Sequence, residues 1–467
     1  MELKIDFTKK IGKIKPMHGI GQPPLVGISE RMFRYVSEAG IPYSRLHDVG
    51  GAFGGNRYVD IHNIFRDFDA DEEDEASYDF TFTDWLLQAL LKQNCEPIFR
   101  LGETIENYHY MKAYRIFPPK DPAKWARICE KIIRHYNEGW ANGFRMGIQY
   151  WEIWNEPDNG RDDSENQMWH GTKEEFYELY TVTAKHLKAV FGDAIKVGGY
   201  ATCGFRHILS DPEKFGIDCE KSDDALYASG RSANFIDFFE GFFAYIKKYD
   251  APIDFFSWHS YLTTERTVVC AQYLDRRLKE LGYGNLETQL NEWNNACEDR
   301  GDPLLASKMA TEEWGTGMAA AKAAAMMCAM QHTNTKILCY YDAQVGTSYY
   351  GGMFNPLTKE PFPAYYAFKA FNELYQLENQ VECTWIGKQG SVGGESSNGR
   401  GVYVLAAERD GRKCVLIANS SPESAEISGD FTEDMNAYIV DDVQTLTEVP
   451  VDKMLVIPSG TLILLKN

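Results

Sequence analysis

The sequence lacks the patterns that mark several classes of protein. Its ten cysteines include no Cys-x-x-Cys pair, and no His-x-His pair occurs, so no pattern indicates a structural zinc site or a dense metal centre. The most apolar stretch, Met318–Met330, is interrupted by Lys322 and is shorter than a membrane span. The sequence therefore predicts no metal, no other cofactor and no membrane partner.

Positive charge is scarce, because 48 Lys and Arg residues oppose 68 Asp and Glu residues and leave a formal net charge of −20. This balance argues against nucleic acid as a partner. The first residues, Met1–Asp6, contain no basic stretch followed by an apolar core, so we expect no signal peptide. Together with cysteines scattered through apolar segments, this predicts a cytoplasmic location. The oligomeric state leaves no pattern.

Short apolar runs alternate with longer amphipathic runs from about residue 16 to residue 375. Eight of the runs have strand character: 16–20, 42–47, 96–100, 149–154, 195–200, 254–258, 287–291 and 337–341. Helices are predicted at 84–91, 121–138, 172–190, 235–249, 271–281, 309–332 and 363–377. Eight such units predict an α/β fold with a closed (β/α)8 TIM barrel. An open doubly wound sheet is the alternative, but the glycine-rich segment 50–55 lacks its G-x-G-x-x-G spacing.

The pattern changes after residue 377. Short β runs at 402–407, 413–419, 425–428, 436–441 and 455–457 are separated by turn residues, and they predict an antiparallel β-sandwich. The segment 387–401 is rich in Gly, Ser and Asn and is expected to be a loop. We therefore predict a catalytic barrel at 14–377 and a sandwich domain at 378–467, with residues 1–13 pairing with the sandwich.

Two short segments each end a strand-like run in Asn-Glu. The first, Tyr150–Asp158, contains Asn155 and Glu156, and the second, Gln289–Asn294, contains Asn291 and Glu292. In a barrel, residues at the carboxyl ends of the strands face one common mouth, so both glutamates are expected there. Two facing carboxylates are what cleavage of a glycosidic bond requires.

Other polar and aromatic residues are predicted at the same ends of neighbouring strands. His47 and Asp48 end the second strand, His259 and Tyr261 follow the sixth, and Tyr341 ends the eighth. Such a set around two carboxylates is typical of a sugar-binding site.

These residues resemble a known group of enzymes. Trp151–Pro157 is similar to the Asn-Glu-Pro acid/base motif of clan A glycoside hydrolases, and most similar to family 39, whose members include β-xylosidases and α-L-iduronidases. Asn291–Asn294 resembles the nucleophile segment of that family, although the residue before the glutamate is usually Thr. Tyr349–Phe354 and Pro363–Phe368 look like the end of the family barrel. The resemblance extends over about the whole chain.

The resemblance implies roles for the candidate residues. Glu156 is the expected acid/base, so its pKa should be raised by burial or by a second carboxylate, and Glu292 is the expected nucleophile. Asn155 is expected to donate to the sugar 2-hydroxyl. The other expected substrate-binding residues are His259 and Tyr261 on the nucleophile side, Trp293 packing against the sugar, and His47, Asp48 and Tyr341.

The resulting hypothesis is a retaining glycosidase that removes a terminal β-xyloside-like sugar from small oligosaccharides. Alternatives are an α-L-arabinosidase, an α-L-iduronidase or an inactive carbohydrate-binding protein. An iduronidase would pair the substrate carboxylate with a cation, for which Arg45, Arg57 and Arg100 are candidates. A metal hydrolase would instead use the set His18, His47, Asp48 and His259.

Overall fold

The computed structural model describes residues 2–24, 30–49, 59–104, 116–163, 166, 168–294, 313–345, 352–385, 401–430, 434–451 and 454–467. Eight parallel strands in these ranges pair in chain order, and the last pairs with the first. They are β2 (Gly19–Gly21), β3 (Tyr43–Leu46), β4 (Glu96–Leu101), β5 (Tyr150–Ile153), β6 (Lys196–Thr202), β7 (Phe255–Ser260), β8 (Glu287–Trp293) and β9 (Thr335–Tyr340). The predicted barrel is confirmed, and each predicted run overlaps one of these strands.

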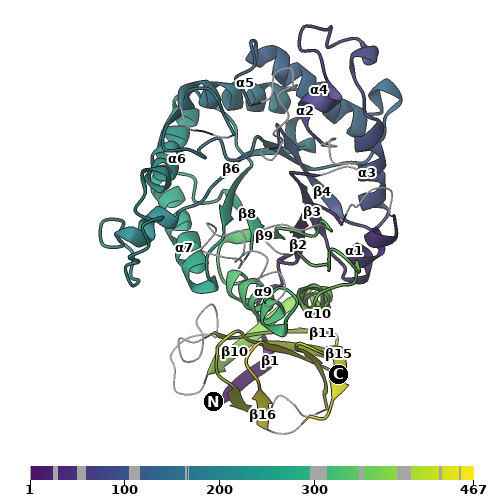
Figure 1. Cartoon of the computed structure of the whole chain (residues 1–467), viewed down its shortest axis with the longest axis vertical. Helices are drawn as coiled ribbons and strands as arrows, with labels where there is room; N and C mark the ends of the chain where they lie inside the picture. Colours follow the sequence, from purple (N-terminus) through teal and green to yellow (C-terminus); the bar gives the residue numbers. More distant parts are fainter. Residues whose placement is uncertain are drawn as a thin grey trace.

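Helices cover the outside of the barrel (Figure 1). The α-helices are α1 (Arg34–Glu38), α2 (Ile61–Ile64), α3 (Thr81–Leu91), α4 (Pro122–Asn137), α5 (Lys173–Phe191), α6 (Gly230–Lys248), α7 (Thr264–Leu281), α9 (Gly317–Met330) and α10 (Pro363–Leu377). Short 3-10 helices are η1 (Glu30–Phe33), η3 (Glu75–Ser77), η4 (Trp140–Asn142), η6 (Gly192–Ala194) and η7 (Arg206–Ser210). Helix starts follow capping chemistry: Asp121 accepts hydrogen bonds from two backbone N–H groups of α4, and Thr172 with Glu175 forms a capping box on α5.

Some boundaries differ from the predicted ones. Helices α6 and α7 begin earlier, because Ser229 and Thr263 cap them. Strand β8 continues through Trp293, so Glu292 lies inside the strand and not after it. The predicted loop at 50–55, most of the one at 387–401 and the predicted helical residues 309–312 lie outside the described residues.

A seven-stranded antiparallel sheet lies below the barrel in Figure 1, with the strand order β1-β10-β11-β12-β17-β14-β15. Its strands are β1 (Leu3–Lys13), β10 (Asn379–Trp385), β11 (Val402–Arg409), β12 (Arg412–Asn419), β14 (Asn436–Val440), β15 (Thr445–Val449) and β17 (Thr461–Lys466). The strands β10, β15 and β17 were not expected from the sequence. A two-stranded sheet, β13 (Ala425–Ser428) with β16 (Met454–Ile457), completes the sandwich. The first strand of the chain, β1, pairs with β10, so both chain ends lie in this part of the molecule.

The two faces of the large sheet bury different side chains. Leu405, Leu416 and Leu464 pair across three strands and belong to the core that the sheet shares with α9 and α10. Their neighbours Val404 and Ile417 point to the other face, into a separate core closed by β13 and β16. This alternation, with its period of two, binds the sheet to the barrel on one face and to the small sheet on the other.

None of the helices in the described ranges has the combination of length and apolar character that crossing a membrane requires.

Replacing Leu416 with Ala should lower the free energy of unfolding by about 3 kcal/mol, because a fully buried leucine leaves a cavity between the sheet and the two helices. Equilibrium urea unfolding followed by circular dichroism measures this. Val456, which is 55% exposed on β16, is the matched control, and its change to Ala should cost less than about 0.5 kcal/mol. Equal losses in both variants would contradict the packing described here.

Candidate active site

The turn after β5 presents Glu156 at the carboxyl end of the barrel. Trp154 and Glu156 both have positive φ angles, 71° and 45°, which reverse the chain sharply after the strand. The indole of Trp154 fixes this turn, because its Nε1 donates to the carbonyl of Met168 at 2.9 Å. The ring also packs between Trp125 and Trp169. A strained backbone is thus held by a buried aromatic cluster, so that the carboxylate faces the mouth.

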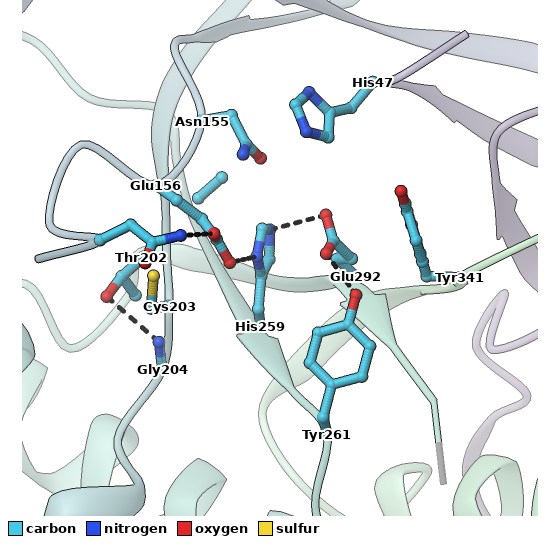
Figure 2. Close-up of polar contacts among 12 residues, drawn as sticks. His47, Asn155, Glu156, Thr202, Cys203, Gly204, His259, Tyr261, Glu292 and Tyr341 are labelled. Atoms are coloured by element: carbon cyan, nitrogen blue, oxygen red, sulfur yellow. Dashed lines mark hydrogen bonds and ion pairs between the residues drawn. The ribbon is translucent and has the colours of Figure 1, made fainter. Parts of the chain in front are cut away.

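The two candidate carboxylates lie on either side of His259 (Figure 2). His259 Nδ1 lies 2.8 Å from Glu156 Oε1, and its Nε2 lies 3.7 Å from Glu292 Oε2. One oxygen of each carboxylate and a ring nitrogen of His259 all lie within 4.8 Å of one another. The sequence placed these three residues at the ends of three strands, and the structure brings them into one cluster.

Glu292 is held by groups from three parts of the barrel. The hydroxyl of Tyr261 donates to Glu292 Oε1, and Arg45 Nη1 donates to Glu292 Oε2 at 3.0 Å. His259 approaches the same Oε2 from β7. Only 7% of Glu292 is exposed, so the few directions from which a ligand can reach it are set by these partners.

Arg45 has a role that the sequence did not reveal. Besides Glu292, its guanidinium donates to Glu152 Oε2 at 2.7 Å through Nε and to Asn155 Oδ1 at 2.6 Å through Nη2. Because arginine only donates, this bond fixes Asn155 with its amide NH2 group pointing elsewhere, available to a ligand. A signal was present: Glu152 interrupts the apolar run of β5, and a charge inside a buried strand requires a partner.

A hydrogen-bonded pair, Asn159 and Arg231, holds Glu156 from the side opposite His259. Asn159 Nδ2 donates to Glu156 Oε2 at 2.7 Å, and Arg231 at the start of α6 donates to Asn159 Oδ1. The neighbouring carboxylate of Asp158 accepts hydrogen bonds from the hydroxyl of Thr202 and from the backbone N–H of Cys203. Burial raises the pKa of Asp158 to about 6, and the charge of Glu156 adds to that shift. Asn159 and Arg231 were not predicted from the sequence, because they belong to no recognisable pattern.

The expectation that the pKa of Glu156 is raised is wrong for the arrangement of side chains in this site. Burial alone would raise it, but the hydrogen bond and charge of His259, together with the charges of Arg231 and His47, lower the pKa of Glu156 to about 2. The pKa of His259 is raised correspondingly: burial opposes this, and the charges of Glu292 and Glu156 overcome it. The pair therefore keeps its shared proton on His259.

Four polar residues adjoin the carboxylates and are called the polar wall: Gln22, His47, Asp48 and Tyr341. Tyr341 donates its hydroxyl to Asp48 Oδ2 at 3.0 Å and accepts from Gln22 Nε2 at 2.6 Å, and His47 Nε2 lies 3.2 Å from the same Asp48 oxygen. The Nδ1 atom of His47 is buried and has no hydrogen-bond partner among the described residues. Figure 2 shows His47, Asn155 and Tyr341 grouped around Glu292. Three of the predicted substrate-binding residues, His47, Asp48 and Tyr341, thus contact one another, together with Gln22, which was not predicted.

Trp293 is the predicted site residue that the structure does not place at a ligand surface. Its side chain has no exposed surface, and its ring packs edge-on against Tyr340 at 5.1 Å. The expectation that it packs against a sugar is therefore wrong for this arrangement. The cause is strand alternation, because Glu292 faces the mouth and the next residue of β8 points away from it.

The candidate cations and metal ligands are otherwise engaged. Arg100 pairs with Asp60 at 2.6 Å, and Arg57 lies outside the described residues. His18 precedes β2 and packs against Phe371 and Tyr375 at the opposite end of the barrel from His47, so the alternative metal set is not assembled.

Two clusters in the described residues have metal-ligand composition: Glu156 with His259 and Glu292, and Asp60 with His62 and Glu103. In the second, His62 Nδ1 lies 2.6 Å from Glu103, and Asp60 is paired with Arg100. Both clusters are thus joined by internal hydrogen bonds and ion pairs.

Comparisons with known proteins indicate the family of this chain. The family model of the glycosyl hydrolases family 39 matches residues 37–299. A β-xylosidase of Geobacillus stearothermophilus is 30% identical over 169 residues, which are 32% of this chain and 31% of the relative. A β-xylosidase of Caldicellulosiruptor saccharolyticus is 26% identical over 217 residues, 43% of this chain and 40% of the relative. The matched segments span less than half of either relative.

Solved structures share the fold over the whole chain. A glucosidase from Croceicoccus marinus has a TM-score of 0.71 at 18% identity, covering 100% of this chain and 98% of that chain. A GH39 β-xylosidase from Caulobacter crescentus has a TM-score of 0.64 at 16% identity, covering 100% and 99%. At such identities the likeness concerns the fold alone. The match of the family model to more than half of the sequence shows that the chain belongs to glycosyl hydrolase family 39.

Proposed function

We propose that this chain is a retaining glycoside hydrolase that removes a terminal β-xyloside-like sugar from small oligosaccharides. The observation that carries the proposal is the cluster of Glu156, His259 and Glu292, whose nearest atoms lie within 4.8 Å of one another. Retaining enzymes keep their carboxyl groups about 5–5.5 Å apart, whereas inverting enzymes need about 6.5–9.5 Å to admit a water molecule. One oxygen of Glu156 lies within 4.8 Å of one oxygen of Glu292, and this close approach supports the retaining assignment.

In this mechanism Glu292 attacks the anomeric carbon while Glu156 protonates the leaving oxygen. The proton begins on His259 Nδ1 and passes to Glu156 Oε1 across their 2.8 Å contact as the leaving oxygen takes it up. The glycosyl ester of Glu292 is then hydrolysed by water, with Glu156 as the base. His259 therefore serves as the proton store for an acid whose own pKa is low.

The wall of the site supports a neutral sugar. Gln22, His47, Asp48 and Tyr341 offer hydroxyl partners, and Asp48 is a carboxylate that would repel the acid group of an iduronide. Arg45, a candidate partner for such an acid group, already donates to three protein groups. The two curated relatives named above are β-xylosidases, which points in the same direction.

On a panel of nitrophenyl glycosides, the proposed function predicts that the β-D-xyloside reacts faster than the β-glucoside and the α-L-arabinoside. The iduronide should also react slowly, since its acid group would face the carboxylate of Asp48. Proton NMR of the first sugar released should show the anomeric configuration of the substrate. An inverted first product would require both glutamate roles to be withdrawn, and absence of turnover on the whole panel would favour a carbohydrate-binding protein.

Alanine substitutions of the two glutamates should respond differently to azide. Glu292→Ala should lower kcat more than about 10³-fold, and azide should yield a glycosyl azide of the opposite anomer. Glu156→Ala should slow the glycosylation step about 10²–10⁴-fold for substrates with poor leaving groups and spare that step for substrates with good ones. For the latter, deglycosylation should become slow, and azide should restore its rate by replacing water. Glu287→Ala at the other end of β8 is the matched control, because Glu287 pairs with Lys196 away from the mouth. The same azide product from both variants would refute the assignment.

The alkaline limb of the kcat/KM profile should move to lower pH in His259→Asn. In the unmodified protein the shared proton is lost only as pH rises through the raised pKa of His259. Without the imidazole the proton rests on Glu156 alone, and a carboxyl group has an ordinary pKa near 4.3. We expect a displacement of at least about one pH unit.

His62→Asn is the control for this experiment, because His62 is also buried and bonded to a carboxylate, that of Glu103, but touches neither candidate glutamate. An alkaline limb that stays in place in His259→Asn, or moves equally in both variants, would contradict the proposal that His259 holds the proton that Glu156 delivers.

A further inference from the structure

A second carboxylate shares the guanidinium that holds Glu292. Arg45 on β3 donates through Nε to Glu152 on β5 at 2.7 Å and through Nη1 to Glu292 on β8 at 3.0 Å. The side chains of Arg45 and Glu152 are 1% and 0% exposed, so water does not screen this group. One cation therefore lies between two anions inside the barrel.

Glu152 is held in its ionised form. Burial by itself would raise the pKa of Glu152, but the charge of Arg45 and hydrogen bonds from Ser257, Arg45 and Asn291 lower it. The amide of Asn291, the residue next to Glu292, donates to Glu152 Oε1. Both residues of the second Asn-Glu segment are thus tied to the Arg45–Glu152 pair.

The shared cation has a chemical consequence for Glu292. If Arg45 faced Glu292 alone, its full positive charge would stabilise the carboxylate in the resting state. Attack on the anomeric carbon consumes that charge, so stabilisation of the ground state alone would slow the reaction. A second anion on the same guanidinium offsets part of the attraction and also fixes the orientation of its planar fork.

We infer that Glu152 is a positioning residue for the proposed glycosidase reaction, which holds the fork of Arg45 and offsets its charge so that Glu292 remains a reactive nucleophile. The inference rests on the function proposed above. Glu152 lies in the strand that leads to the first Asn-Glu pair, but it belongs to neither pair nor to the polar wall, and its side chain is fully buried.

Other charged or titratable groups face Glu292 and keep their chemical identity when Glu152 is changed. They are Arg45 itself, His259 from β7, the hydroxyl of Tyr261 and the carboxyl group of Glu156. Cys339 on β9 lies near Arg45, but burial raises the pKa of its thiol to about 12, so it carries no charge at neutral pH.

Glu152→Gln is the variant of choice, because it keeps the shape of the side chain and removes one negative charge. Asn291 can accommodate the new amide. Its Oδ1 is buried and has no hydrogen-bond partner in the part of the chain that the structure describes, so a flip of the Asn291 amide would supply an acceptor. The acidic limb of the kcat/KM profile, which reports deprotonation of the nucleophile, should then move to lower pH by about one unit. The kcat for a substrate limited by glycosylation should fall about tenfold.

Asp60→Asn is the matched control. It removes the carboxylate from another fully buried arginine pair of the same barrel, Arg100–Asp60 at 2.6 Å, which does not touch Glu292. A purely structural effect would lower the stability of both Glu152→Gln and Asp60→Asn, and it would leave the acidic limb of the kcat/KM profile unchanged in both. If the limb stays in place in Glu152→Gln, or moves equally in Asp60→Asn, the inference is overturned.

A second measurement separates this inference from the proposed function. The carboxyl carbon of Glu292, assigned by its loss in Glu292→Gln, can be followed by ¹³C NMR as pH varies without any turnover. Its titration midpoint should fall in Glu152→Gln and return toward the original value in Arg45→Met/Glu152→Gln, which removes both charges. An unchanged midpoint in Glu152→Gln, or an equally lowered midpoint in the double variant, would overturn the role of Glu152 even if the protein hydrolyses xylosides. Lack of turnover by the unmodified protein would count against the proposed function alone.

Discussion

The candidate site depends on one buried guanidinium. Arg45 donates to Glu152, Asn155 and Glu292, and so joins both Asn-Glu segments from inside the barrel. A buried charge is tolerated only when its donors are matched by acceptors of opposite charge or suitable polarity. That requirement fixes the side chains of three strands relative to one another before any substrate arrives. Preorganisation of this kind is what a reaction with two cooperating carboxylates needs.

The second constraint is the position of a proton. Two donors, His259 and Asn159, each bond one oxygen of Glu156, and this favours its ionised form. A carboxylate in that state cannot act as an acid unless a neighbour stores the proton, and His259 is the neighbour with a raised pKa. In the proposed reaction, acid and base roles would alternate on Glu156 with little movement, because the hydrogen-bonded pair would exchange one proton.

The sandwich supports the barrel through the helices that follow its last strands. Leu405, Leu416 and Leu464 of the large sheet pack on α9 and α10, and β9, which leads to Tyr341, runs between these two helices in the sequence. The N-terminal strand β1 closes the edge of this sheet and leads directly into β2. The two ends of the chain thus fix the first and last strands of the barrel, from which Gln22 and Tyr341 of the polar wall project.

The barrel, the sandwich that follows it and the two glutamates at strand ends could be predicted from the sequence, because the periodicity of apolar residues and the Asn-Glu strand ends are local patterns. The sequence also placed His259 and Tyr261 beside the glutamates, since strand ends converge in a barrel. The remaining features of the site could not be read from the sequence and follow from the tertiary structure. The side of β8 on which Trp293 lies, the partners of Arg45, the pair formed by Asn159 and Arg231, and the direction of the Glu156 pKa shift all arise from contacts between residues far apart in the chain. Hydrogen bonds and charge interactions in a buried site depend on ångström distances between such residues, and a linear pattern does not contain those distances.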